Sequence, residues 1–215
     1  MSAPIRPLPP LPWNQLARSE YRVDQGAILA ALQAQRNVHA LVARNGFCMA
    51  LVLDWVSRTL GGRLPGASTY SNATSAGMKA CVADHVTGYF AAATGVAQIT
   101  GVSKALGLVP REVARGSAVG TPLGVLGAPA VVAGAVLKHA CRQGVGLLFI
   151  QLGGGAHAIG FRVIGGTFRF FDPNFGSFVA RDRPTFNKAL QGLLEDEYSS
   201  VNSYEIYDFA QGFAL

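Results

Sequence analysis

One segment of the chain, residues 47–60, restricts the possible folds more than any other. It is apolar on nearly every side when arranged as a helix, and only four of its residues are polar. A helix that is apolar all round is buried at the centre of a protein. Gly61 and Gly62 follow the segment and provide a typical C-terminal stop. We therefore expect a central helix that the remainder of the chain encloses.

The hydrophobic pattern changes at Gly144. The residues before it carry Ala-rich helical patterns, whereas those after it indicate short strands. Gly165 and Gly166 separate two strand-like runs and are a strong hairpin signal. Helices first and strands second predict an α+β fold, in which a small, mostly antiparallel sheet packs on the central helix. The expected strands are residues 145–152, 156–164, 167–171 and 203–209, with a possible short strand at Phe178.

We expect one folded domain behind a short leader. Five prolines fall within the first 12 positions, so residues 1–22 are predicted to form an extended, flexible leader. Residues 23–215 form the folded domain, with a helical half at about 23–143 and a sheet half at about 144–215. The helices expected besides the central one are residues 25–36, 129–142 and 183–197, with two more between residues 74 and 108, and residues 110–122 are expected to be a loop.

The composition excludes several classes of protein. Half of the chain is hydrophobic and 14% is charged, which is incompatible with a disordered chain or a coiled coil. The net charge of +6 is spread along the chain without a basic run, so no nucleic-acid partner is expected. The longest uncharged stretch, residues 116–137, is interrupted by Pro and Gly, so we expect no integral membrane span. The N-terminus lacks the apolar core of a secretory signal peptide.

The three cysteines are too few, and odd in number, for a disulfide framework. Cys48 lies at the start of the central helix, where the helix dipole and unpaired backbone N–H groups favour a thiolate. The alternative for Cys48 is a buried structural cysteine. Cys81 and Cys141 lie in Ala-rich helical stretches and are expected to be inert, and no residue set suggests a metal site or a cofactor.

His157 and Asp172 are placed together by the expected hairpin. If Gly165 and Gly166 form its turn, the residue opposite His157 is Asn174, and Asp172 lies two positions away on the same strand. Asp172 would then accept from His Nδ1–H and orient the ring, with Asn174 as the alternative orienting residue.

These residues suit nucleophilic catalysis. His157 would take the proton of the Cys48 thiol, and the thiolate would attack a carbonyl, as in the layout of papain-like enzymes. Glycines next to His157 leave the backbone bare, so a substrate chain could approach closely there. The candidates for a substrate groove are Gly154, Gly155 and Ala156.

Three blocks of the sequence resemble the YopT/AvrPphB-type cysteine proteases, which are bacterial effectors. The blocks are NGFCMAL through Trp55, GAHAIG at residues 155–160, and FFDPNFG at residues 170–176. The resemblance implies a papain-like catalytic domain in which Cys48 is the nucleophile, His157 the general base and acid, and Asp172 the orienting residue. Asn45 is the candidate oxyanion donor, with the Cys48 backbone N–H as the second donor.

The resemblance also implies a biological setting. A protease of this kind would act as a monomer on a host protein, of the small GTPase or kinase class, after delivery into the host cytoplasm, where it could associate with membranes. A second hypothesis uses the same triad for lysine fatty acylation, or for another Cys-based transfer, on a host protein. A third is a non-enzymatic effector or adaptor that binds a partner, with the Pro-rich leader as one candidate contact.

Overall fold

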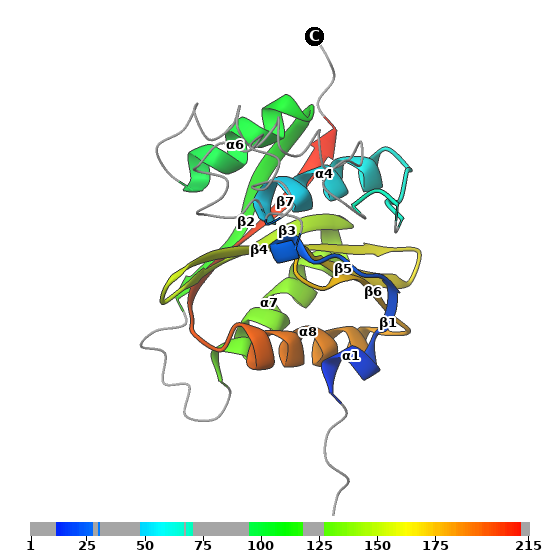
Figure 1. Ribbon diagram of the computed structural model, residues 1–215. Coiled ribbons are helices and arrows are strands. Elements are labelled where there is room, and N and C mark those ends of the chain that lie inside the picture. The colour runs from blue at the N-terminus through cyan, green and yellow to red at the C-terminus, as the bar shows by residue number, and fades with distance from the viewer. Residues whose placement is uncertain are drawn as a thin grey trace, which may run out of the picture.

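The computed structural model describes residues 12–27, 30, 48–66, 68–70, 95–117 and 127–211. These residues form three layers, with a sheet between two layers of helices (Figure 1). Helices α4 (Cys48–Leu60) and α6 (Gly95–Ala105) lie on one side of the sheet. Helices α7 (Ala128–Gln143), α8 (Arg183–Glu197) and the short α1 (Trp13–Leu16) lie on the other. The predicted α+β class is confirmed.

The sheet has seven strands, and every neighbouring pair runs antiparallel. Their order across the sheet is β1-β6-β5-β4-β3-β7-β2, so the hairpin β4–β5 lies near the middle. The strands are β1 (Arg18–Tyr21), β2 (Leu108–Ser117), β3 (Val145–Leu152), β4 (Gly155–Ile164), β5 (Thr167–Asp172), β6 (Gly176–Ala180) and β7 (Val201–Gln211).

The central helix expected from residues 47–60 is α4. Residues Cys48 to Val56 are all buried, and the helix packs on β3, β4, β5 and β7. Its apolar surface on one side meets the sheet, and Tyr70 and Ile99 belong to the same hydrophobic core. Because α4 is enclosed by the sheet and by these other core residues, its sequence shows almost no polar face.

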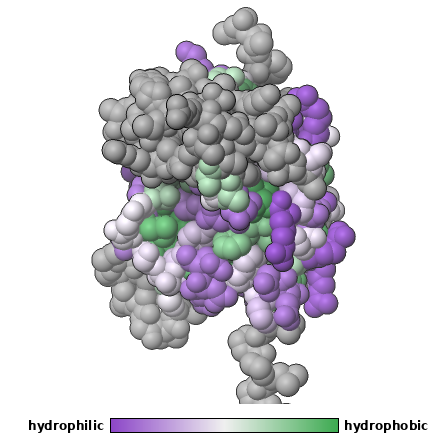
Figure 2. All heavy atoms as spheres, viewed as in Figure 1, coloured by the Kyte–Doolittle hydropathy of each residue, from purple (hydrophilic) through white to green (hydrophobic). Residues whose placement is uncertain are grey.

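The continuous apolar run of β3 has the same cause. Leu147 and Phe149 point into the core beneath α4, whereas Leu148 and Ile150 point into the core beneath α7 and α8. Both faces of this strand are therefore covered by helices, and its first six residues are all buried. Figure 2 shows that the hydrophobic residues of one face of the molecule gather at mid-height, at the level of the sheet.

The hairpin that the glycine pair predicted is present. Ile164 pairs with Thr167, and Gly165 and Gly166 have φ angles of 58° and 75°. Both turn residues therefore occupy the left-handed region that glycine tolerates and that favours tight two-residue hairpins. The register follows directly from this turn.

One strand was not expected from the sequence. Residues 110–122 were predicted to be a loop, but Leu108–Ser117 forms β2, which pairs with β7 at the edge of the sheet. Most of its residues are partly or fully exposed, so the strand lacks a hydrophobic pattern. Pro110 and the bulge after Glu112 are tolerated because an edge strand leaves one side unpaired.

The N-terminal segment also differs from the prediction. Residues 13–21 were assigned to a flexible leader, but they form α1 and β1, and β1 pairs with β6. Trp13 is buried, with its ring 5.0 Å from that of Phe178 and 5.5 Å from that of Phe175. The prediction relied on the prolines before Trp13 and did not take account of this buried aromatic residue. Residues 1–11 lie outside the described part of the chain.

Within the described residues, no helix combines the length and the apolar character needed to cross a membrane. Asn45 and Cys81 lie outside the described residues, as does the side chain of Cys141. Their expected roles stay predictions.

Candidate active site

Three elements bring the predicted catalytic residues to one edge of the sheet. Cys48 is the first residue of α4, His157 lies at the beginning of β4, and Asp172 is the last residue of β5. Because β4 and β5 are antiparallel, the start of one and the end of the other meet at the same edge. All three side chains are largely removed from solvent, with exposures of 9%, 5% and 0%.

His157 and Asp172 form a direct contact. His157 Nε2 lies 3.1 Å from Asp172 Oδ2. The carboxylate was expected at Nδ1 but lies at Nε2, so the ring is turned the other way. Nε2 is occupied by the carboxylate, which leaves Nδ1 as the ring nitrogen available to Cys48, whose side chain is near enough to raise the pKa of the imidazole.

The surroundings of His157 keep the ring protonated. Burial alone would lower the pKa of the imidazole, but the buried Asp172 carboxylate, together with Cys48, outweighs it and raises the pKa from 6.5 to about 10. At neutral pH the ring is therefore an imidazolium that contacts the Asp172 carboxylate and has Cys48 as a neighbour. Such a ring stabilises a neighbouring thiolate and holds a proton ready for a leaving group.

Asp172 is itself held by a turn. The backbone N–H of Asn174 donates to Asp172 Oδ1 at 2.8 Å, and the Phe175 N–H donates to the Asp172 carbonyl at 3.1 Å. Asn174 Nδ2 points elsewhere and donates to the Tyr198 hydroxyl at 3.1 Å. Asn174 was predicted as the alternative residue that orients His157. Its contacts in this site are with Asp172 and Tyr198.

Tyr198 is the residue of this site that sequence reasoning missed. Its ring stacks on the imidazole of His157, with ring centroids 4.6 Å apart and planes inclined by 20°. Its hydroxyl lies 2.9 Å from both His157 Nε2 and Asp172 Oδ2. Burial and the Asp172 carboxylate raise the pKa of Tyr198, so the phenol stays protonated. Tyr198 follows α8, far from the three motif blocks, and no local pattern marks it.

The non-reacting residues of the motifs pack together behind the site. Trp55 of α4 stacks on Phe171 of β5, and a Cβ on Gly160 of β4 would lie 2.9 Å from the Trp55 ring. Gly160 therefore permits the close approach of α4 to the sheet. Each of the three blocks contributes one residue to this contact.

The predicted substrate-groove residues directly precede His157 in the chain. Gly154, Gly155 and Ala156 are exposed, and a Cβ at either glycine would meet no atom within 4 Å. Their role in substrate binding stays a prediction. Across the ranges that the structure describes, no cluster of three or more His, Cys, Asp or Glu side chains is arranged to hold a metal ion.

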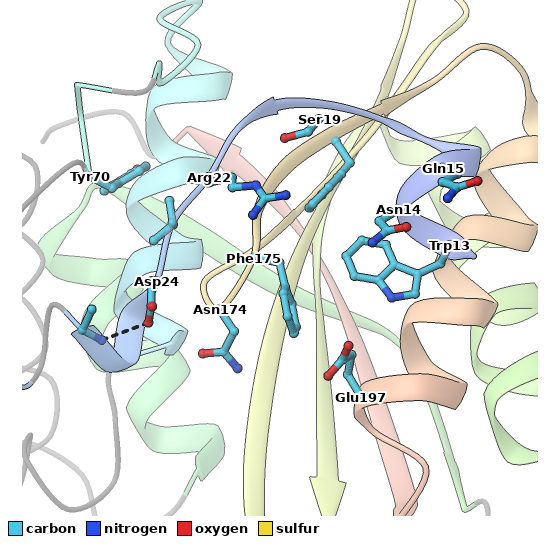
Figure 3. Close-up of a pocket in the computed structure, with 13 residues that line it drawn as sticks. Trp13, Asn14, Gln15, Ser19, Arg22, Asp24, Tyr70, Asn174, Phe175 and Glu197 are labelled. Atoms are coloured by element: carbon cyan, nitrogen blue, oxygen red, sulfur yellow. Dashed lines mark hydrogen bonds between the residues drawn. The ribbon is translucent and has the colours of Figure 1, made fainter. Parts of the chain in front are cut away.

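A cleft of about 860 Å³ adjoins the site through Asn174 (Figure 3). Trp13, Phe175 and Phe178 give it an aromatic wall. Arg22, which follows β1, and Glu197, the last residue of α8, lie on opposite sides of Phe175 in this view, and both are exposed. The cleft thus combines an aromatic surface with one cationic side chain, Arg22, and two anionic ones, Asp24 and Glu197.

Comparison with known proteins identifies the class. Residues 130–206 match the model of the peptidase family described as Yersinia/Haemophilus virulence surface antigen, and this segment contains His157, Asp172 and Tyr198. A search of curated protein sequences gives no match.

Two solved structures are similar in fold. The Pseudomonas avirulence protein AvrPphB matches with a TM-score of 0.59 at 19% identity, covering 79% of this chain and 94% of AvrPphB. The ubiquitin-specific protease of the murine cytomegalovirus tegument protein M48 matches with a TM-score of 0.50 at 16% identity, covering 90% of this chain and 87% of that one.

The family match over residues 130–206 and the papain-like fold together support a cysteine protease, a hydrolase acting on peptide bonds. The resemblance to the YopT/AvrPphB-type proteases, a family of virulence effectors, is confirmed.

Proposed function

We propose that the protein is an effector endopeptidase that cleaves a host protein through Cys48, His157 and Asp172. The observation that carries this proposal is the contact between His157 and the buried Asp172 carboxylate, together with the influence of the neighbouring Cys48 on the pKa of the imidazole. This is the order of groups that activates a thiol as a nucleophile.

The reaction follows from these positions. The Cys48 thiolate attacks the carbonyl carbon of the scissile peptide bond, and His157 gives its proton to the departing amine nitrogen. The product of this step is a thioester between Cys48 and the acyl part of the substrate. His157, now neutral, takes a proton from a water molecule, whose oxygen attacks the thioester. The carboxylic acid and the Cys48 thiolate are released, which restores the thiolate–imidazolium pair.

The developing oxyanion needs hydrogen-bond donors. The backbone N–H of Cys48 is suited to this role because it belongs to the first turn of α4, where N–H groups have no partner within the helix. Asn45 is proposed as the second donor.

The cleft beside the triad is the proposed site for part of the polypeptide substrate. It borders Asn174, which contacts both Asp172 and Tyr198, so a chain lying across the sheet edge at His157 reaches the cleft directly. Its aromatic wall suits a large apolar side chain, and Arg22 and Glu197 suit charged neighbours.

Two products distinguish the protease from a lysine acyltransferase with the same triad. The wild-type protein and a Cys48→Ala control are incubated with a lysate of host cells in the presence of an alkyne-labelled fatty acyl donor. We expect new protein N-termini that depend on Cys48, detected by terminal labelling and mass spectrometry. Transfer of the alkyne to lysines without new N-termini would overturn the protease assignment in favour of the transferase. Neither product would favour the non-enzymatic adaptor.

The setting is proposed from the same family. A virulence effector of this class would meet its substrate in the cytoplasm of the host cell. The mass-spectrometric experiment names the cleaved protein directly, and it tests the expectation of a small GTPase or a kinase.

A further inference from the structure

Tyr198 covers one face of the His157 ring. It is 6% exposed, and its ring lies nearly parallel to the imidazole at a centroid distance of 4.6 Å. The residue is positioned by the end of α8, since its backbone N–H donates to the Leu194 carbonyl at 3.1 Å. The stack therefore connects the catalytic edge of the sheet with the helical layer behind it.

The hydroxyl of Tyr198 uses its full hydrogen-bonding capacity within the site. Its O–H donates to Asp172 Oδ2 at 2.9 Å. Its oxygen accepts from Asn174 Nδ2 at 3.1 Å and from His157 Nε2–H at 2.9 Å. A phenol has one donor and two acceptor positions, and all three are filled by groups of the candidate active site.

This arrangement fixes which nitrogen of the ring faces Cys48. The Nε2–H is shared between Asp172 Oδ2 and the Tyr198 oxygen. If the ring turned over about its Cβ–Cγ bond, a carbon would face both acceptors, and Asp172 and Tyr198 would each lose the hydrogen bond from His157. The stacked ring also prevents the imidazole from tilting away from this plane.

We propose that Tyr198 is a positioning residue for the thiol chemistry, which holds His157 with Nδ1 facing Cys48. The proposal rests on the proposed function, because it concerns the same pair of reacting groups. It assigns two separable contributions to one side chain: the ring fixes the plane of the imidazole, and the hydroxyl fixes its rotation.

A purely structural role is the competing explanation. Tyr198 ends α8 and fills part of the core between that helix and the sheet, so its loss could simply lower stability. Stability and positioning are separable by experiment, because the reactivity of Cys48 can be measured in the folded protein.

The test uses iodoacetamide, whose reaction at Cys48 is followed by mass spectrometry of the peptide that contains it. The measured quantity is the ratio of the alkylation rate at pH 6 to that at pH 9.5, where a thiolate forms without help from His157. The variants are Tyr198→Phe, which removes only the hydroxyl, and Tyr198→Leu, which also removes the ring. Tyr207→Phe is the matched control, since the Tyr207 hydroxyl contacts Glu205.

We expect the ratio to fall about tenfold in Tyr198→Phe, as the loss of hydrogen bonds to charged groups implies, and further in Tyr198→Leu. Tyr207→Phe should keep the wild-type ratio. Ratios within twofold of wild type in both Tyr198 variants would overturn the proposal and leave a structural role. If Tyr198→Leu does not fold, Tyr198→Phe decides, because it conserves the packing of the ring.

The His157→Gln protein separates this test from that of the proposed function. If wild type and His157→Gln show the same ratio, the pairing of His157 with Cys48 fails, and the role of Tyr198 fails with it. If they differ but Tyr198→Phe behaves as wild type, only the role of Tyr198 is lost.

Discussion

Trp55 and Phe171 lie face to face, with ring centroids 5.7 Å apart and planes inclined by only 7°. Trp55 belongs to the helix that begins with Cys48, and Phe171 immediately precedes Asp172. The stack therefore joins the element that carries the nucleophile to the strand that carries the orienting carboxylate. The distance between the reacting groups depends on this contact, although neither ring takes part in the chemistry.

The contact between α4 and the sheet should be sensitive to one methyl group. In Gly160→Ala the new Cβ would lie 2.9 Å from the Trp55 ring, so the helix must shift. We expect a loss of about 1–3 kcal/mol in the free energy of unfolding, measured by urea denaturation, and slower alkylation of Cys48. Gly153→Ala is the control, because its Cβ would meet no atom within 4 Å. Equal stabilities of the two variants would contradict the close approach.

The raised pKa of His157 predicts a pH-dependent stability. The folded state holds the imidazolium more strongly than the unfolded chain, so this stabilisation is complete below the ordinary pKa of 6.5. It is lost as pH rises towards about 10. The comparison is made in the Cys48→Ala background. Asp172 remains there, and of the two residues that raise the pKa of His157 it has the larger effect.

We expect the Cys48→Ala protein to lose stability between pH 6.5 and 10 relative to Cys48→Ala/His157→Gln. Urea denaturation at several pH values measures the difference. Parallel curves for the two proteins would contradict a raised pKa of His157.

Asp172 and Asn174 should differ in their importance. In the wild-type protein both carboxylate oxygens of Asp172 accept hydrogen bonds. Oδ1 accepts from the Asn174 N–H, and Oδ2 accepts from the Tyr198 O–H and the His157 Nε2–H. Asp172→Asn replaces one of these oxygens with an NH2 group. A donor would then meet a donor whichever way the amide is turned. We expect kcat/KM for a cleaved peptide to fall on the order of 100-fold or more.

Asn174→Ala keeps the backbone N–H that holds Asp172, and it removes the bond to the Tyr198 hydroxyl together with one polar group of the cleft. Its kcat/KM should fall by less than about tenfold. The reverse order of the two effects would make Asn174 the orienting residue.

Trp13 should behave as part of the core. Its ring contacts Phe170, Phe175 and Phe178, so Trp13→Ala should cost about 3–5 kcal/mol in the free energy of unfolding. Asn14→Ala, at an exposed neighbouring position, serves as the control and should change little. A thermal melt unchanged by Trp13→Ala would show that this segment does not stabilise the domain.

Sequence reasoning succeeded where one physical signal dominated. The glycine pair at residues 165 and 166 set the hairpin register, and that register alone brought His157 and Asp172 together. Residues 183–197 were predicted as a helix and form α8, which begins at the N-cap Asp182 and carries a clear apolar face. The sequence of α4 is apolar on nearly every side, and this correctly predicted that the helix is buried.

It failed where a contact depended on distant parts of the chain. Tyr198 meets His157 only because α8 runs back across the sheet, and no local pattern encodes that return. The choice between Nδ1 and Nε2 is decided by the same tertiary placement. The edge strand β2 was missed because its pairing with β7 buries too little apolar surface to leave a pattern.

The length of α8 determines where Tyr198 lies relative to His157. The helix begins where the Asp182 carboxylate accepts from the Thr185 N–H, and it runs to Glu197, directly before Tyr198. Each helical residue advances the chain by about 1.5 Å and turns it by about 100°. Inserting or deleting one residue inside α8 would carry the phenol out of reach of the imidazole while leaving Cys48, His157 and Asp172 untouched. Relatives of this chain that use the same contact should therefore conserve the number of residues between these two points more strictly than their identity.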